Sequence, residues 1–203
     1  MRYDENHKRE TRARVVKAAA AAVRAEGASR VGVAEIMARA GLTHGGFYAH
    51  FPSKEALLGE ALAEGFAQGW RRLEKASEAQ TPAQSLAAMI DSYVSEGHRD
   101  VPERGCPAAT VASELPHLGP AARAAFDDGV RLVIASIAGR LDEGSPQERE
   151  ALAGSAFAEM AGAVALSRAV SDPELSSRLL AESRRRIKAR LGLTDPPAKK
   201  DPE

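Results

Sequence analysis

The chain has 203 residues, of which 44% are apolar and 28% are charged, and its 28 basic and 28 acidic side chains cancel. This composition excludes a fully disordered chain, and the length supplies enough apolar side chains for a substantial core. A single cysteine excludes a disulfide framework and a cysteine-cluster metal site, so we expect neither metal nor cofactor. Because no apolar run approaches the ~20 residues of a membrane span and the N-terminus lacks a signal peptide, we expect a soluble cytoplasmic protein.

The residue types favour an all-α fold. Alanine supplies 41 residues, whereas valine, isoleucine and threonine together supply 22. Alanine is the strongest helix former and β-branched residues favour strands. No alternating apolar and polar run and no Asn-Gly or Asp-Gly hairpin turn is present. We therefore expect helices throughout.

Helix starts are marked by capping residues followed by proline, at Thr81-Pro82, Ser145-Pro146 and Asp172-Pro173. Glycines and a Pro-Pro pair mark the ends. Residues 1–6 and 194–203 are expected to be loose tails, and the segment from Gly97 to Gly105 to be irregular. The pattern predicts nine helices, over residues 8–26, 33–40, 44–50, 54–79, 82–97, 107–114, 120–143, 146–170 and 173–191.

Charge is distributed unevenly along the chain. Residues 1–55 carry ten basic and six acidic side chains together with three of the five histidines, and residues 56–203 carry an excess of four acidic side chains. A basic N-terminal part on an acidic body indicates a polyanionic partner for that part. The basic residues of the first helix, Arg14, Lys17 and Arg24, are expected to form a solvated face.

The segment from Ile36 to Leu58 has the pattern of a helix-turn-helix. A short helix ends at Gly41, a three-residue turn follows, and a second short helix begins with Thr43 as its expected N-cap. The second helix of such a unit can enter the major groove of DNA.

The second helix of this unit has an unusual outer face. Phe47 and Phe51 share one side and are expected to pack inward. Gly45, Gly46 and Ala49 face away from them, although glycine costs a helix about 1 kcal/mol relative to alanine. Small residues on an outer face favour the close approach of a large partner such as DNA.

Polar groups flank this small-residue face. His44 and Tyr48 lie toward one edge, where they can meet base edges. Lys54 begins the next helix, where its ammonium group and the free N–H groups of the helix can hold a phosphate together.

From about Thr11 to Leu58 the sequence resembles the TetR family of bacterial transcriptional regulators. The resemblance includes the Ala40-Gly41 pair and the signature Phe47-Tyr48-x-His50-Phe51-x-Ser53-Lys54-Glu55-x-Leu57-Leu58. It implies a three-helix DNA-binding domain, here residues 1–52, and a larger helical domain, here residues 53–203, that binds a ligand and dimerises. It also implies repression that the ligand relieves.

The resemblance assigns operator contacts by position. Members often carry Ser or Thr before the second helix, where this chain has Val31-Gly32, and Arg30 is the candidate substitute. Thr43 and His50 also have local roles open to them, as a helix cap and as a partner for carbonyl groups. The expected DNA-contacting residues are Arg30, Thr43, His44, Gly45, Gly46, Tyr48, His50 and Lys54.

Large side chains are rare in the body of the chain, and most are expected to be core. In an alanine-rich helical body they can also wall an apolar ligand site, with one or two polar groups for orientation. His98 and His117 stand apart from other metal-ligating residues. The candidate ligand-binding residues are Phe66, Trp70, Met89, Tyr93, Cys106, Thr110, Phe126, Phe157 and Met160.

The last two long helices are the candidate dimer interface. Gly154, Ala158 and Gly162 recur every four residues and permit close helix approach, and an apolar seam follows on the last helix. Both features can also serve one chain internally. The resemblance implies a homodimer through these helices, for which the candidates are Gly154, Ala158, Gly162, Leu175, Leu179 and Ile187.

Cys106 stands immediately before Pro107, the expected first residue of a helix. As an N-cap beside Arg104 its thiol is expected to have a lowered pKa. TetR-like regulators that respond to electrophiles or oxidants are similar here. The alternative is a cysteine that only caps the helix or lines a reversible ligand pocket.

The leading interpretation is a ligand- or redox-responsive dimeric repressor without enzymatic activity. The alternatives are a helical thiol-dependent enzyme that uses Cys106 and an interaction module that does not bind DNA. No Ser/His/Asp set and no phosphate-binding loop supports an enzyme.

Overall fold

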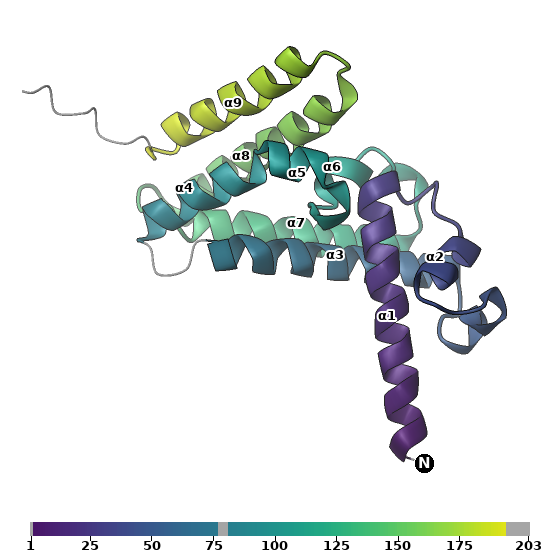
Figure 1. Cartoon of the computed structure of the whole chain (residues 1–203). Helices are drawn as coiled ribbons and strands as arrows, with labels where there is room; N and C mark the ends of the chain where they lie inside the picture. The colour runs from purple at the N-terminus through teal and green to yellow at the C-terminus, as the bar shows by residue number, and fades with distance from the viewer. Residues whose placement is uncertain (1, 77–80, 194–203) are drawn as a thin grey trace, which may run out of the picture. The chain divides into compact units, whose positions relative to one another are not determined.

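The computed structural model describes residues 2–76 and 81–193, and within these ranges the chain is helical without strands, which confirms the all-α prediction (Figure 1). The elements are α1 (Arg2–Glu26), α2 (Val33–Arg39), the 3₁₀ helix η1 (His44–Ala49), α3 (Lys54–Ala76), α4 (Pro82–Tyr93), α5 (Glu96–Asp100), η2 (Pro102–Arg104), α6 (Ala108–Val111), η3 (Leu115–His117), α7 (Pro120–Ala138), α8 (Pro146–Ala169) and α9 (Pro173–Arg190).

The chain forms two compact units. Unit 1 comprises residues 1–72 and 97–133, and unit 2 comprises residues 73–96 and 134–203. The boundaries fall within α3, α5 and α7. Unit 1 therefore contains the predicted helix-turn-helix together with the segment that carries Cys106.

Several predicted helix bounds are corrected at the N-terminal side and in the middle of the chain. Helix α1 begins at Arg2, so most of the expected loose tail of residues 1–6 is helical. Helix α4 ends at Tyr93, and α5 begins at Glu96, which places Gly97 inside a helix and not at its end. Because glycine only weakens a helix, the neighbouring residues still form one turn around Gly97.

The second half of the chain requires similar corrections. The segment from Gly97 to Gly105 contains part of α5 and the whole of η2, so it is not irregular throughout. Helix α6 has four residues where eight were predicted, and α7 ends at Ala138. The predicted C-terminal tail and residues 77–79 of the predicted fourth helix lie outside the described residues.

The helix starts that were predicted from capping residues are confirmed. Thr81 and Ser145 each accept the N–H three residues on, and the side chains of Gln84 and Glu148 return to the N-cap backbone. These two pairs are capping boxes. Asp172 caps α9 by accepting from Glu174 N and Leu175 N.

The core of unit 1 joins segments that are far apart in the sequence. Val23 of α1, Ile36 of α2 and Phe47 of η1 are almost fully buried, and Val111 and Leu115 belong to the same cluster. Helix α6 and η2 pack against α1, and Figure 1 shows α6 beside the C-terminal part of α1. The helix-turn-helix and the residues after Cys106 therefore share one hydrophobic core.

In unit 2, α8 packs against α9, and α4 also contacts α9. The rings of Tyr93 and Phe157 meet edge to face at 6.0 Å. Lys188 Nζ lies 2.9 Å from an Asp91 carboxylate oxygen and ties α9 to α4. Across both units, no helix among the described residues is long and apolar enough to cross a membrane.

Candidate functional sites

The predicted helix-turn-helix is formed by α2, a glycine turn and η1. Gly41 adopts φ +71°, which favours glycine, and Leu42 N donates to Met37 O over 2.9 Å to close the turn. The second helix is a 3₁₀ helix and not the expected α-helix. Its two consecutive glycines have low α-helix propensity, and the helix is only six residues long.

The inward and outward faces of η1 are as predicted. Phe47 and Phe51 are each 1% exposed, with ring centroids 5.6 Å apart. Tyr48 is 75% exposed, and its ring meets Phe47 edge to face at 5.2 Å. This contact holds an exposed aromatic side chain on a rigid base, which is typical of a recognition surface.

The glycines on the outer face are not required by packing within the chain. A Cβ atom at Gly45 would meet nothing within 4 Å, and one at Gly46 would meet only Met37 Cε at 3.7 Å. Neither residue has a positive φ. The fold would therefore accept alanine at both positions, and their small size favours contact with something outside the chain.

The other predicted DNA contacts lie around η1. Thr43 occupies the N-cap position but makes no side-chain cap hydrogen bond, and His44 is exposed. Lys54 is the half-buried first residue of α3. Arg30 is exposed in the turn before α2, whose N-cap, Gly32, makes no side-chain cap bond.

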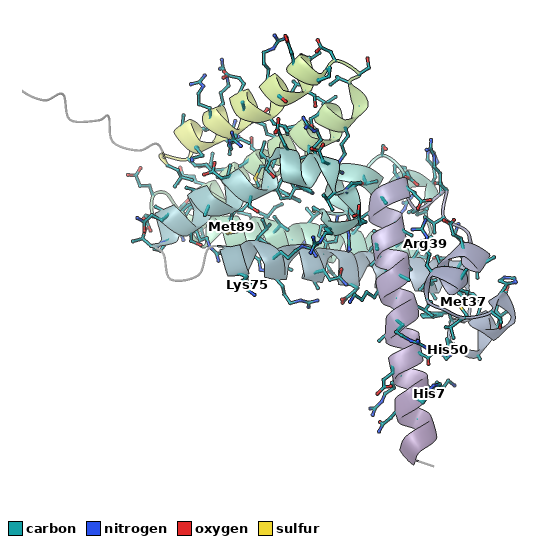
Figure 2. The ribbon with its side chains drawn as sticks, in the orientation of Figure 1. His7, Met37, Arg39, His50, Lys75 and Met89 are labelled. Atoms are coloured by element: carbon teal, nitrogen blue, oxygen red, sulfur yellow. The ribbon has the colours of Figure 1, made fainter. Side chains whose placement is uncertain are left out.

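His50 lies in a basic environment. Burial, followed by the positive charges of Lys8, Arg12 and His7, lowers the pKa of His50 below its usual 6.5. Figure 2 shows His50 near the part of α1 that carries His7. The buried Nδ1 atom of His50 has no hydrogen-bond partner among the described residues. The lowered pKa favours the uncharged imidazole at this position.

Arg12 was not predicted to belong to this site, yet it joins three elements. Its Nε donates to the carbonyl of His50 over 3.4 Å, and its guanidinium carbon lies 4.7 Å from the centroid of the Phe51 ring. It also pairs with Glu60 of α3. The available sequence signal was its position one turn before Val16 and Val15 on the helix that packs against η1.

Cys106 is 8% exposed, and its backbone N–H donates to Nε2 of His98 over 2.9 Å. This backbone contact of His98 was not predicted. Helix α6 begins at Ala108 with Pro107 at the N-cap position, so Cys106 is not the N-cap. A helix of four residues also supplies little dipole, so the predicted N-cap contribution to a lowered thiol pKa is wrong. The expected contribution of Arg104 stays a prediction.

Arg24 is a further correction. It was predicted to lie on a solvated face, but it is 2% exposed. Arg24 lies four residues after Ala20, which is fully buried, so the two share one face of α1. This spacing was the available sequence signal for the burial of Arg24. Its Nε donates to Glu103 O and its Nη2 to Gln68 Oε1, so it lies close to the segment that precedes Cys106.

The candidate ligand residues fall into two groups. In unit 1, Phe66 and Phe126 meet edge to face at 5.5 Å, and Thr110 Oγ1 donates to Arg24 O. Of the nine candidate ligand residues, Thr110 and Phe126 are partly buried and the other seven are buried. Their role in ligand binding remains a prediction. Unit 1 contains Phe66, Trp70, Cys106, Thr110 and Phe126, and unit 2 contains Met89, Tyr93, Phe157 and Met160.

The candidate dimer residues differ in exposure. Ala158 and Leu175 are exposed, whereas Gly154, Gly162 and Leu179 are partly buried. A Cβ atom at Gly162 would meet nothing within 4 Å, so space remains over this part of α8. The sixth candidate, Ile187, is fully buried and packs inside its own chain.

No group of three or more histidine, cysteine, aspartate or glutamate side chains in the described parts of the chain could hold a metal ion. The chemistry available at these sites is that of the polar groups around η1 and of the Cys106 thiol.

Two family models match the sequence. Residues 15–61 match the model of bacterial regulatory proteins of the tetR family, and residues 82–175 match the C-terminal domain of LmrA/YxaF-like transcriptional regulators. A curated relative, the HTH-type transcriptional regulator YfiR of Bacillus subtilis, is 27% identical over 103 residues. That alignment covers 51% of this chain and 50% of the relative, so the chain spans about half of its length.

Solved structures share the fold. The reduced form of NemR from E. coli has a TM-score of 0.72 at 22% identity, covering 89% of this chain and 96% of that one. A TetR-family regulator from Agrobacterium tumefaciens has a TM-score of 0.74 at 19% identity, covering 90% of this chain and 98% of that one. At these identities the similarity establishes the helical architecture.

Proposed function

Because the chain belongs to the TetR family of bacterial transcriptional regulators, we propose that it is a dimeric cytoplasmic repressor that binds operator DNA through η1. A small apolar or electrophilic effector releases the DNA. The functional division is a DNA-binding part over residues 1–52 and an effector and dimerisation part over residues 53–203.

The observation that carries the DNA-binding role is the outer face of η1. Tyr48 projects into solvent from a rigid aromatic base, beside two glycines whose size packing within the chain does not require. Backbone atoms at Gly45 and Gly46 can approach the DNA closely, while Tyr48 and His44 reach base edges. Lys54, the first residue of α3, contacts a phosphate in this proposal.

A dimer supplies two such elements for a two-fold symmetric operator. The exposed side of α8 carries small or apolar residues, among them Ala158 and Leu166, which is 56% exposed. A second α8 can approach this side closely, and the two η1 elements then enter major grooves about 34–36 Å apart or a multiple of that spacing.

For effector response, Cys106 is the candidate nucleophile. With an α,β-unsaturated carbonyl compound, the thiolate sulfur bonds the β-carbon, and the π-electron pair moves toward the α-carbon, which takes a proton from water. The negative charge at sulfur is lost in this step. Since Cys106 lies in the same unit as η1, the change arises in the unit that contacts DNA.

The thiol-dependent enzyme is the second candidate. It requires a base directed at Cys106, but Nε2 of His98 accepts the backbone N–H of Cys106. That nitrogen holds the main chain in place. The geometry therefore favours a regulator over an enzyme at this site.

The proposal is tested with duplexes that tile the region upstream of the protein's own gene, in an electrophoretic mobility assay. We expect one short segment to form a complex that weakens as salt rises and that is lost after Cys106 is alkylated with iodoacetamide. Absence of any specific complex would contradict the DNA-binding role. A complex that survives full alkylation would contradict only the thiol response.

A further inference from the structure

Arg24 is a buried cation near the end of α1 whose hydrogen bonds are incomplete. Its Nε donates to the carbonyl of Glu103 over 2.8 Å, and its Nη2 donates to Oε1 of Gln68 over 2.9 Å. The buried Nη1 has no hydrogen-bond acceptor among the described residues. Burying a charge without a partner of opposite sign is costly, so a nearby negative charge would stabilise this guanidinium.

Nη1 of Arg24 lies beside a glycine of α3. A Cβ atom at Gly65 would lie 3.1 Å from Nη1 and 2.9 Å from Cγ of Pro107. One turn on, a Cβ atom at Gly69 would lie 3.6 Å from the carbonyl oxygen of Gly105. The residues on both sides of Cys106 therefore rest on the glycine face of α3, with Nη1 beside them.

The surrounding charges do not neutralise Arg24 fully. Burial, followed by the positive charge of Arg72, lowers the pKa of Arg24 to about 10, and Cys106, Glu64 and Glu103 oppose this shift. Arg72 itself donates to the carbonyl of Arg104. Arg24 thus stays charged near neutral pH, and a negative charge on Cys106 favours that charge.

We propose that Arg24 is the counter-charge of the Cys106 thiolate and that it couples the state of this thiol to α1. This inference rests on the proposed thiol response. Arg24 acts as a positioning residue, since it holds the sulfur in its ionised form and takes no part in bond formation. When iodoacetamide alkylates the thiolate, a sulfur–carbon bond forms, iodide leaves, and Arg24 loses its anion.

Loss of the thiolate charge affects α1, the helix that supports the DNA-binding element. Arg24 lies in the last turn of α1, two residues before its end. The hydroxyl of Thr110, just beyond Cys106, donates to the carbonyl of Arg24 over 2.9 Å. Uncompensated charge at Arg24 therefore favours a shift of the C-terminal turn of α1 and of the turn leading to α2.

The first test measures the rate of iodoacetamide alkylation of Cys106 against pH in the full-length chain. In Arg24→Gln the midpoint should rise by about half a pH unit or more, which makes alkylation about threefold slower below the midpoint. Arg24→Lys should restore most of the rate. The matched control is Lys17→Gln, which removes the same charge from an exposed position of α1 and should leave the midpoint unchanged.

Because His98 bonds the backbone of Cys106, each profile is repeated in a His98→Gln background, which removes the imidazole. A folded Arg24→Gln protein with the wild-type midpoint in both backgrounds would overturn the proposal. So would a rise of equal size in Arg24→Lys, because that variant keeps the positive charge.

A second test does not depend on the Arg24 variants folding. Cys106→Asp places a carboxylate near Arg24, and Cys106→Asn is the uncharged control of nearly the same size. The Asp variant should melt at a higher temperature than the Asn variant at pH 7.5, and the difference should vanish as the carboxylate is protonated. An Asp variant that melts at or below the Asn variant at pH 7.5 would overturn the proposal, because buried Asp without a counter-charge is unfavourable. Neither test involves DNA, so loss of the repressor role alone leaves both unaffected.

Discussion

The backbone N–H of Ser29 donates to Oε2 of Glu114 over 2.7 Å, across 85 residues of sequence. Ser29 lies in the turn between α1 and α2, and Glu114 follows α6. Gly27, in the same turn, adopts φ +91°, and a Cβ atom there would collide with the Glu114 carboxylate. The segment after Cys106 therefore supports the turn from which the helix-turn-helix begins.

Replacing Glu114 by Gln should weaken this support. A neutral amide accepts the Ser29 N–H less strongly than a carboxylate, and we expect the free energy of unfolding to fall by about 1 kcal/mol. Urea denaturation measures the change. The control is Glu143→Gln, an exposed glutamate of unit 2. Equal stability of the Glu114 variant and the wild type would show that the bond contributes nothing.

The Gly45→Ala variant is expected to lower operator affinity without lowering stability. Because a Cβ atom at Gly45 meets nothing within 4 Å, we expect the stability to be unchanged or to rise by a few tenths of a kcal/mol. Operator affinity should fall tenfold or more, since the added methyl group blocks close approach. Thermal melting and fluorescence anisotropy measure the two effects. Unchanged affinity would mean that DNA does not approach this face.

Lys54→Ala should weaken binding to all DNA sequences alike. Lys54 begins α3 and is expected to contact phosphate, so its loss should reduce the slope of log affinity against log salt by about one contact. Titrations at several salt concentrations with operator and random DNA give both quantities. A loss confined to the operator would assign Lys54 to base recognition.

The lowered pKa of His50 predicts an effect of acid on stability. As the pH falls below the usual 6.5, the unfolded chain takes up a proton before the folded chain does. The free energy of unfolding contributed by His50 is therefore present above 6.5 and is lost as the pH falls toward the lowered pKa. His50→Gln should lose less stability than the wild type between pH 7.5 and 5.5 in urea denaturation. An identical loss in both proteins would contradict this contribution.

The parts of the fold that the sequence predicted are those governed by local chemistry. The capping boxes at Thr81 and Ser145 and the inward packing of Phe47 and Phe51 follow from side chains a few residues apart. Such signals predicted helix starts and the faces of η1. Their agreement with the structure reflects short-range hydrogen bonds and helical periodicity.

The errors concern features that depend on distant segments. Arginine is seldom buried, so Arg24 was assigned to the surface despite its spacing from Ala20, and its burial depends on Glu103 and Gln68 from other elements. The contact of His98 was not predicted because its partner, the backbone of Cys106, presents no sequence signal. Tertiary contacts of this kind are not encoded in spacing along the chain.

The central claim is that η1 reads operator sequence, and it is tested most directly by the ratio of operator to random-DNA affinity at one salt concentration in wild type and Tyr48→Ala. The Tyr48 ring is 75% exposed, and we expect it to contact bases. We predict a high ratio for the wild type and a loss of at least tenfold in Tyr48→Ala, with binding to random DNA nearly unchanged. Equal ratios for the two folded proteins would contradict the claim.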